Sequence, residues 1–367
     1  MRSRRTFLTA SLAALTVAGL SSSAWSADSA KYDQVVAKAI DYLRSKGRAA
    51  DGSYSKQTGI GVTALATTAL LRHGRSPDDP LVAESLKYLA ANVQADGGIY
   101  APKSEFQNYE TCVALMCFVE ANKDGRYQKI VDGANKYLRG LQATEDKGVG
   151  KEDVSYGGAG YGGKRRPDLS NTAFLVEALK SAGAEADDQA LQQALVFVSR
   201  CQNLESEHNT SPLATKVNDG GFYYTVAGGG LWPLSADGQG LRSYGTMTYA
   251  GLKSMIYAGV GPDDKRVQAA LKWIQKNYDL KTNPGQGDNG LYYYYHTFAK
   301  ALDTLDQKDI TDESGKKHDW RAELVEALAQ QQREDGAWVN KNGRFLESDA
   351  NLVTAYALLA LSHCRPR

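Results

Sequence analysis

Two kinds of helical segment alternate along the chain, and they differ in how their apolar residues are distributed. The first kind is amphipathic, with polar residues such as Glu84 and Lys87 on one face. Six such segments centre on Leu43, Leu89, Leu138, Val198, Ile274 and Leu328. The second kind is apolar nearly all round and rich in alanine, and its six members start near Thr63, Thr111, Thr172, Thr248, Thr297 and Thr354. The first pattern predicts helices with one wet face, and the second predicts helices packed on every side.

The alternation of the two kinds predicts a single closed architecture. Each amphipathic segment and the apolar segment after it form a helical hairpin, and the hairpins recur at a spacing of roughly 46 to 76 residues. Six hairpins place six amphipathic helices outside and six apolar helices inside. We therefore predict an all-α fold, an (α/α)6 toroid, with strands confined to the long loops.

A glycine cassette recurs in the loops that lead from an outer segment to an inner one. It consists of a glutamine, a glycine four residues later and an aromatic residue two further on. Complete copies are Gln94-Gly98-Tyr100, Gln286-Gly290-Tyr292 and Gln332-Gly336-Trp338. We expect the cassette glycine, Gly98 or Gly336, to occupy a tight turn in which a β-branched residue would be strained.

Paired aspartates stand directly before three outer segments, as Asp78-Asp79, Asp187-Asp188 and Asp263-Asp264. A carboxylate pair is a candidate catalytic acid, but three copies at equivalent positions do not fit a single active site. Aspartate accepts hydrogen bonds from the free amides of a first helical turn. The pairs are therefore interpreted as helix caps.

The chain opens with an arginine pair, Arg4 and Arg5, followed by an apolar run over residues 10–20 and small residues at 24–27. This order is typical of a twin-arginine export signal with cleavage near residues 24–27. We assign residues 1–27 to the signal peptide and 28–367 to the toroid, and expect a soluble periplasmic or extracellular protein. No later apolar run approaches the length of a membrane span, so no transmembrane anchor is expected in the mature form.

Charge and cysteine content narrow the function classes. Removal of residues 1–26 would take away three arginines and no acidic residue, which changes the formal net charge from +1 to −2. That balance does not favour a nucleic-acid partner. The cysteines Cys112, Cys117, Cys201 and Cys364 show no Cys-x-x-Cys spacing, so buried free thiols are expected rather than disulfides.

The cassettes and the six-hairpin array resemble the prenyltransferase/squalene-hopene cyclase repeat superfamily over residues 30–365. The resemblance implies the toroid already predicted, with a central cavity that opens where the inner helices start. It also implies that the glutamine and the aromatic residue of each cassette tie a loop to helix ends.

Two chemistries of that superfamily depend on motifs that this chain lacks. Squalene cyclases carry an Asp-x-Asp-Asp acid, and the nearest string here, residues 185–188, falls on a capping turn at the opposite end of the barrel. Those cyclases also have two α-barrel domains, whereas this chain has residues for one. Protonation-driven cyclisation is therefore not favoured by the motifs.

The zinc site of protein prenyltransferases is also incomplete. His296 follows Tyr295 and precedes Thr297, as around the family's zinc histidine, but Arg242 and Tyr244 align with its Asp and Cys ligands. A guanidinium cannot replace a carboxylate on zinc, and tyrosine is a poor substitute for thiolate. We expect no metal and no cofactor.

The candidate site lies in the two long glycine-rich loops, residues 143–167 and 203–243, and at the starts of the inner helices. The expected ligand contacts are Arg165, Arg166, Asn171, Arg242, Tyr244, Tyr294 and His296. Of these, Tyr244, Tyr294 and His296 are the catalytic candidates. Glu110 and Asp349 begin other inner helices and could line the same mouth. An alternative role for Arg242 is an ion pair with Asp237.

The six convergent helix amino termini and the three arginines predict a positive field, which favours an anionic or polar ligand. Three functions remain open. The chain could bind or act on an isoprenoid-type or polar amphiphile. It could be a polysaccharide lyase-like enzyme, in which tyrosine or histidine takes a proton from a uronate polymer beside arginine. It could also be a non-enzymatic periplasmic scaffold. The expected partner is a small-molecule or glycan ligand.

Overall fold

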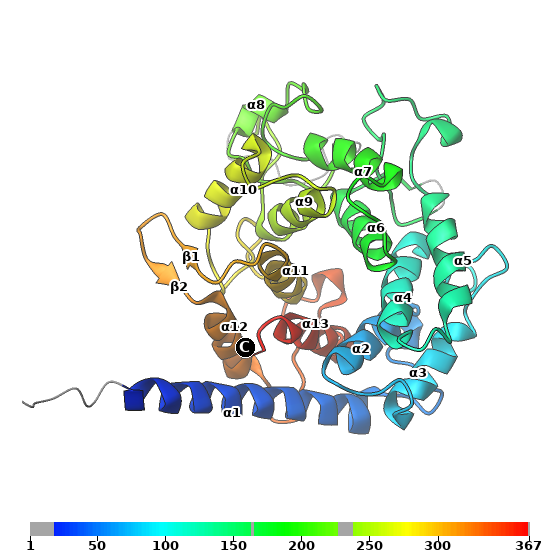
Figure 1. Ribbon diagram of the computed structural model, residues 1–367, viewed down its shortest axis with the longest axis vertical. Helices are drawn as coiled ribbons and strands as arrows, with labels where there is room; N and C mark the ends of the chain where they lie inside the picture. The colour runs from blue at the N-terminus through cyan, green and yellow to red at the C-terminus, as the bar shows by residue number, and fades with distance from the viewer. Residues whose placement is uncertain (1–17, 163–164, 227–237, 366–367) are drawn as a thin grey trace, which may run out of the picture.

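The computed structural model describes residues 18–162, 165–226 and 238–365, and six helical hairpins within them form two concentric rings (Figure 1). The inner helices are α2 (Gly61–Arg72), α4 (Gln107–Ala121), α6 (Leu169–Ser181), α9 (Gly245–Tyr257), α11 (Leu291–Thr304) and α13 (Ala350–Ser362). The outer helices are α1 (Ala18–Tyr42), α3 (Pro80–Ala90), α5 (Gln128–Arg139), α7 (Gln189–Arg200), α10 (Lys265–Lys276) and α12 (Trp320–Gln331). The arginine pair of the predicted export signal lies outside the described residues.

Contacts between neighbouring helices close the ring. Each inner helix packs against the next, and α13 packs against α2. The first outer helix, α1, contacts both α12 and α13, so the first and last hairpins meet. The predicted (α/α)6 toroid is therefore confirmed.

Burial follows the two sequence patterns. In α4, eleven residues between Asn108 and Ala121 are buried, and they lie on all sides of the helix. By contrast, α5 buries only Val131, Ala134 and Leu138. The aspartates before the outer helices are caps, as predicted. Asp79, Asp188 and Asp264 are the N-caps of α3, α7 and α10, and each accepts a hydrogen bond from the amide two residues on.

Short elements occupy the connections. A two-stranded antiparallel pair, β1 (Ile310–Thr311) and β2 (Lys317–His318), lies between α11 and α12, rather than in the long loops where strands were expected. The short helix α8 (Ala214–Val217) lies in the second long loop. A π-helical turn, Leu43–Gly47, follows α1, and 3-10 turns occur at Lys56–Thr58, Glu145–Lys147 and Arg344–Leu346.

The threonine near the start of each inner helix holds the loop before it. In five hairpins of the described chain its Oγ1 accepts a hydrogen bond of 2.9–3.3 Å from a loop N–H. The pairs are Tyr54 with Thr63, Ile99 with Thr111, Ala159 with Thr172, Phe222 with Thr248, and Trp338 with Thr354. Thr297 differs, since its hydroxyl donates to the carbonyl oxygen of Tyr293. The fifth hairpin therefore does not share the register that the aligned threonines suggested.

A glycine with left-handed backbone stands two residues before each of those loop N–H groups. These are Gly52, Gly97, Gly157, Gly220 and Gly336, with φ between 77° and 90°. A Cβ at any of them would lie 1.8–2.7 Å from a backbone carbonyl oxygen of the next outer helix. Repeat loops thus pack backbone against backbone, which only glycine permits. The prediction was right for Gly336 and wrong by one residue for Gly98, because Gly97 holds the left-handed position.

Glutamines tie several loops to the next outer helix. Gln332 donates to the carbonyl oxygens of Gly336 and Val35, and Trp338 Nε1 donates to Leu328, as expected for this cassette. Gln142 and Gln202 make the same pair of bonds in hairpins with degenerate cassettes. In the fifth hairpin the tie is made by Asn283, which donates to Thr246 and Asn289, rather than by the expected Gln286.

Two further expectations can be compared with the described residues. All four cysteines are buried and free, as predicted. Within residues 18–162, 165–226 and 238–365, none of the helices has the length and apolar character needed to cross a bilayer.

The packing of the repeat glycines predicts a graded loss of stability. Gly97→Ala should lower the free energy of unfolding by about 3 kcal/mol, because backbone strain adds to a clash with the Gly133 carbonyl oxygen 2.7 Å away. Gly125→Ala is the matched control. Gly125 has a similar φ of 82°, but nothing lies within 4 Å of an added Cβ, so only about 1 kcal/mol should be lost. Urea denaturation measures both, and equal losses would contradict the packing role.

Candidate functional site

A cavity of about 410 Å³ opens where the inner helices start, at the end of the barrel predicted to carry the site. All six inner helices contribute to its wall. Their lining residues are Gly61 and Val62, Tyr109 and Glu110, Ser170, Asn171 and Phe174, Thr246 and Met247, Tyr293, and Leu352 and Tyr356. The loops add Thr58, Phe106, Tyr161, Tyr224, Tyr244, Asn283, Asn289, Gly290, Phe345 and Leu346.

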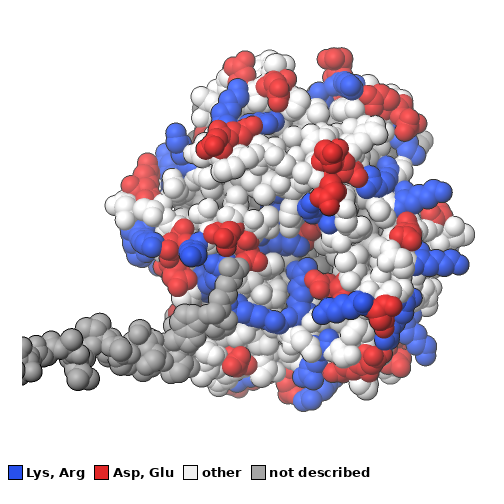
Figure 2. Space-filling view, in the orientation of Figure 1, with Lys and Arg blue, Asp and Glu red and all other residues white. Residues whose placement is uncertain are grey.

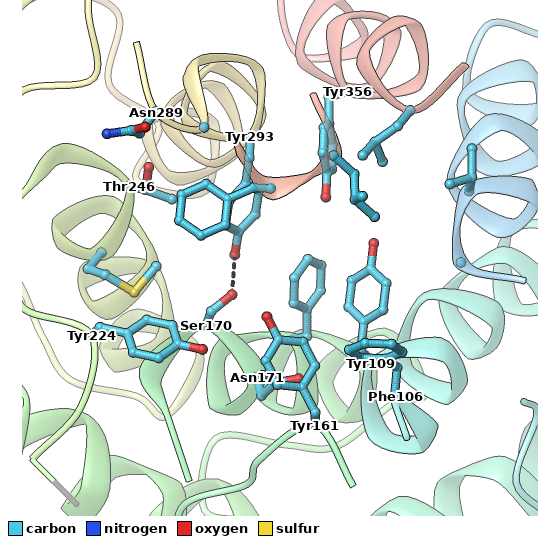
Figure 3. A pocket seen from close by; sticks show the side chains of 18 of the residues that line it. Phe106, Tyr109, Tyr161, Ser170, Asn171, Tyr224, Thr246, Asn289, Tyr293 and Tyr356 are labelled. Atoms are coloured by element: carbon cyan, nitrogen blue, oxygen red, sulfur yellow. Dashed lines mark hydrogen bonds between the residues drawn. The ribbon is translucent and has the colours of Figure 1, made fainter. Parts of the chain in front are cut away.

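Aromatic rings in mutual contact form most of the wall (Figure 3). Phe174 stacks on Tyr293 with ring centroids 5.8 Å apart and planes at 10°, and meets Tyr109 edge-on at 5.2 Å. Tyr356 packs on the other side of Tyr293, at 5.5 Å. The hydroxyls of these tyrosines point toward the hollow, and that of Tyr293 pairs with Ser170 Oγ at 2.9 Å. The wall is apolar with neutral hydroxyl groups set into it.

The positive ends of the inner helices are covered by groups of the chain itself. Glu110 accepts from the amide of Ile60 at the start of α2, and Glu347 accepts from the amides of Tyr292 and Tyr293 in α11. Asp168 and Asp349 cap α6 and α13. Carbonyl oxygens do the same at the other two helices, where Tyr161 accepts from Asn108 and Pro284 from Gly245. These acceptors use helix-end amides that the predicted anion would need, so the arrangement does not favour an anionic ligand.

Three of the capping carboxyls have raised pKa values because they are buried. Burial raises the pKa of Asp168 to about 7, against the opposing effects of Asn171 and the Tyr224 hydroxyl. It also raises the pKa of Glu110 and of Glu347. Asp168 is 3% exposed, and Asn171 donates to both of its oxygens, at 2.8 Å from the backbone N–H and 2.8 Å from Nδ2. It thus lies just behind the wall formed by Asn171, Tyr161 and Tyr224.

Asn171 and Tyr244 are the two predicted site residues that line the cavity. The Oδ1 of Asn171 is buried and has no hydrogen-bond partner among the described residues. An acceptor of this kind can receive a hydroxyl or amide donor from a ligand. Burial raises the pKa of Tyr244 well above its ordinary value, so it is a neutral phenol and a poor proton acceptor.

The three predicted arginines lie outside this cavity. Arg242 and Arg166 are exposed, and Arg165 is exposed and paired with Glu105. None of the three is among the lining residues. Asp237, the alternative partner of Arg242, lies outside the described residues, as do Lys164 and Trp232 of the long loops. Solvated side chains of this kind follow their loops to the surface, and the convergence of arginine, tyrosine and histidine that a uronate lyase needs is not formed at the cavity by the described residues.

Tyr294 and His296 also lie elsewhere, which corrects the prediction for α11. The fully buried Tyr294 packs against Tyr249 and donates to the carbonyl oxygen of Asp279. His296 lies deeper in the barrel, where its ring stacks on Tyr356 at 5.8 Å. Burial holds the pKa of His296 well below its ordinary value, so the imidazole is neutral.

A shift in register explains why Tyr293 was missed. In the other five hairpins the residue two before the aligned threonine lines the cavity, as Gly61, Tyr109, Ser170, Thr246 and Leu352 do. If Tyr295 takes the threonine's place in the fifth hairpin, the same rule selects Tyr293. The periodic signal was present in the sequence, but the choice of Thr297 displaced it by two residues. Asp168 and Glu347 were not among the predicted site residues, because nothing in the sequence beside them shows that their carboxyls are buried.

Exposed apolar residues surround the mouth. Phe106, Phe345 and Leu346 are 44%, 49% and 54% exposed, and all three line the cavity. Phe345 and Leu346 have left-handed backbone, with φ of 60° and 63°. Bulky residues rarely adopt that conformation, so the segment that holds them at the mouth is strained.

Metal ligation can be assessed for the described chain. Residues 18–162, 165–226 and 238–365 contain no group of three or more His, Cys, Asp or Glu side chains placed to hold a metal ion. The candidate chemistry of the site therefore rests on its aromatic rings, hydroxyls and buried carboxyls.

Comparison with known proteins gives a family-model match to part of the chain and a similar fold over most of it. The family model described as the squalene-hopene cyclase C-terminal domain matches residues 55–226. These residues run from the loop before α2 into the second long loop. No curated protein matches the chain. The apo structure of the type II terpene cyclase MstE from Scytonema has a TM-score of 0.54 at 12% identity, over 91% of this chain and 98% of that chain.

Two other solved structures have lower scores. A protein from Actinoplanes has a TM-score of 0.48 at 14% identity, over 91% of this chain and 99% of that chain. A wild-type glycosidase has a TM-score of 0.49 at 13% identity, over 94% of this chain and 98% of that chain. At the identity of MstE the likeness concerns the fold alone, which is that of the six-hairpin ring described above. The family-model match over residues 55–226 and the shared fold support a relation to the terpenoid cyclase/protein prenyltransferase superfamily of α/α toroids.

Proposed function

We propose that this chain binds a neutral isoprenoid-type amphiphile in the aromatic cavity, with a hydroxyl of the ligand donating to Asn171 Oδ1. The observation that carries the proposal is the character of the wall. It is a cavity of about 410 Å³ lined by aromatic rings, at a barrel end whose helix amides are already hydrogen-bonded. Cavities of this size and composition suit small apolar ligands with a few polar anchors.

The polarity of the ligand follows from the groups it would meet. The carboxyls of Glu110, Asp168 and Glu347 surround the helix starts, so a phosphate or uronate would lose its hydration and meet negative charge. An isoprenoid chain would bury its methyl groups against Phe174, Tyr293 and Tyr356 instead. The apolar rim at Phe106 and Phe345 supports entry of such a chain from this side.

Export would bring the protein to the periplasm or the extracellular space, where it would meet lipids rather than cytosolic prenyl diphosphates. This part of the proposal rests on the arginine pair and the apolar run at the amino terminus. A reporter fusion to residues 1–27 tests it. Export should be lost when Arg4 and Arg5 are both changed to Lys, and export through the general secretory route would contradict it.

A second function, proton-catalysed rearrangement of the bound isoprenoid, is favoured by one observation. Asp168 is a buried carboxyl whose pKa of about 7 leaves it largely protonated at mildly acidic pH. Its proton could pass through the Tyr224 hydroxyl to an alkene in the cavity. The carboxyl O–H bond would break, a C–H bond would form on the alkene, and the tertiary carbocation would lie among aromatic faces. Transfer of a proton from a neighbouring carbon to water restores the alkene, and solvent reprotonates Asp168.

The binding proposal predicts a rank order of ligands. Geranylgeraniol should bind at least about tenfold more tightly than geranylgeranyl diphosphate, because the diphosphate would be desolvated beside carboxyls. It should also bind a few-fold more tightly than its methyl ether, which has no O–H to donate to Asn171. Titration followed by tyrosine and tryptophan fluorescence measures all three. Preferential binding of the diphosphate, or of a uronate oligosaccharide, would contradict the proposal.

Variants separate the cavity wall from the barrel core. Phe174→Ala removes the ring stacked on Tyr293 and should weaken geranylgeraniol binding at least about tenfold, as roughly 100 Å² of apolar contact is lost. Tyr294→Phe changes the neighbour of Tyr293 that faces the core, so it should lower stability by about 1 kcal/mol and leave binding unchanged. The reverse outcome would show that the ligand site lies elsewhere.

The acid candidate is tested by isotope exchange. Geranylgeraniol incubated with the wild-type protein in D₂O at about pD 6 should gain deuterium at alkene positions, as measured by mass spectrometry. Asp168→Asn should abolish this gain, whereas Asp263→Asn, an exposed carboxylate before α10, should retain it. No incorporation by the wild-type protein would leave ligand binding as the function and exclude the acid role.

The raised pKa of Asp168 also predicts how stability changes with pH. The folded chain holds this proton up to about pH 7, whereas the unfolded chain loses it near pH 4. The contribution of protonated Asp168 is therefore complete below about pH 4 and is lost as pH rises through 7. Between pH 5 and 8 the free energy of unfolding should fall by roughly 2 kcal/mol more in the wild type than in Asp168→Asn. Parallel pH profiles would show that Asp168 titrates normally.

A further inference from the structure

The interior of the barrel changes character below the aromatic cavity. One turn beyond Phe174 on α6, the carboxylate of Glu177 accepts hydrogen bonds from Lys253 Nζ on α9 and Lys300 Nζ on α11. Glu177, Lys253 and Lys300 are only 3%, 4% and 7% exposed. Burial opposes ionisation of Glu177, but the two ammonium groups outweigh it and hold the pKa of this carboxyl well below its ordinary value. The group is therefore a buried ionic cluster.

This cluster lies toward the end of the barrel where the inner helices finish. Lys253 and Lys300 each stand four residues before the last residue of their helix. In Figure 1 the carboxyl terminus, which directly follows α13, lies toward the viewer between α12 and α13. Figure 2 shows the same face hollowed in the middle, with Lys and Arg side chains around the hollow. The cluster is thus buried toward the hollowed face of the barrel.

Neither the charges nor the hydrogen bonds of the cluster are balanced by the described residues. Two ammonium groups share one carboxylate, and each donates to a single Glu177 oxygen although an ammonium group has three N–H donors. Buried charges and buried donors are normally paired, because an unpaired one loses its hydration without compensation. Arg72 does not supply the missing partner, since it is itself a cation and pairs with Glu120 at 2.7 Å.

Helix ends do not balance the cluster through hydrogen bonds. The carboxyl ends of the inner helices carry partial negative charge on backbone carbonyl oxygens, but the bonds of Lys253 and Lys300 go to Glu177. His296, which is 4% exposed and interacts with Glu177, has a buried Nδ1 without a partner in the described chain. The Nζ atoms of Lys253 and Lys300 and the Nδ1 of His296 can therefore each make further hydrogen bonds.

We infer that Lys253 and Lys300, with Arg72 at the rim, form a binding site for a small oxyanion at the carboxyl-terminal mouth of the barrel. An oxyanion would supply the missing negative charge and several acceptor oxygens. The site is separate from the aromatic cavity, because neither Lys253 nor Lys300 is among the residues that line that cavity. It stands independently of the proposed isoprenoid ligand. Burial lowers the pKa of Lys300 to about 8, so Lys300 is mostly protonated at pH 7.

Inorganic phosphate is the probe for this site. Calorimetric titration at pH 7 and constant ionic strength should show saturable binding of one phosphate per chain. Lys300→Met leaves Lys253 paired one-to-one with Glu177, so the variant should fold and bind phosphate at least tenfold more weakly. Lys272→Met, which removes an exposed lysine on the outer helix α10, should bind as the wild type does.

A third variant changes affinity in the opposite direction. Glu177→Gln removes the anion that competes for the two lysines, so phosphate should bind at least tenfold more tightly and should raise a lowered melting temperature. Acetate titration shows whether a single carboxylate is sufficient. The inference is overturned if the wild type shows no saturable binding of either anion, or if Lys300→Met binds phosphate as tightly as the wild type. In either case the helix carboxyl ends and water would balance the lysines.

Discussion

The six inner helices all run in the same direction, and this single constraint shapes both ends of the barrel. Parallel helix dipoles gather partial positive charge at one mouth and partial negative charge at the other. At the first mouth, side-chain carboxylates cap α2, α6, α11 and α13, and carbonyl oxygens cap α4 and α9. At the other, Lys253 and Lys300 pair with the buried Glu177. Because the positive ends are used up by the protein itself, the cavity between them is left aromatic and neutral.

The fold could be predicted because its determinants are local and repeated. Outer and inner helices differ in apolar pattern over a single turn, and the capping aspartates stand next to the helices they cap. The loop glycines were also visible as a repeat. The physical reason for these glycines could not be read from the sequence, because the left-handed turn at Gly97 is needed for contact with Gly133 in the next hairpin. A one-residue error in the cassette register was therefore possible at Gly98 while the prediction at Gly336 was right.

The site was harder to predict because it depends on contacts between distant hairpins. Glu110 caps a helix fifty residues before it, and Glu347 binds amides more than fifty residues before it. Nothing within a local window shows that these carboxyls fold inward, so the helix starts were expected to attract an anion. Arg242 reinforced that expectation, yet its side chain is exposed. Asn171 and Tyr244 do line the cavity, and their positions next to inner-helix starts follow from the repeat alone.

Phe174, Tyr293 and Tyr356 belong to the aromatic cavity. His296 lies deeper in the barrel, where it interacts with Glu177 of the ionic cluster. Such a division would let one scaffold hold an apolar ligand at one mouth and an anion at the other without mixing the two environments.

The central claim is that the cavity holds a neutral amphiphile. The most direct test is mass spectrometry of the organic extract from protein purified without detergent from its natural host. The account predicts one predominant hydroxylated isoprenoid-type compound in near-equimolar amount, strongly depleted when Phe174→Ala is purified in parallel. Recovery of a phosphorylated compound or a uronate sugar in its place, or of the same lipid in equal amount from Phe174→Ala, would contradict it.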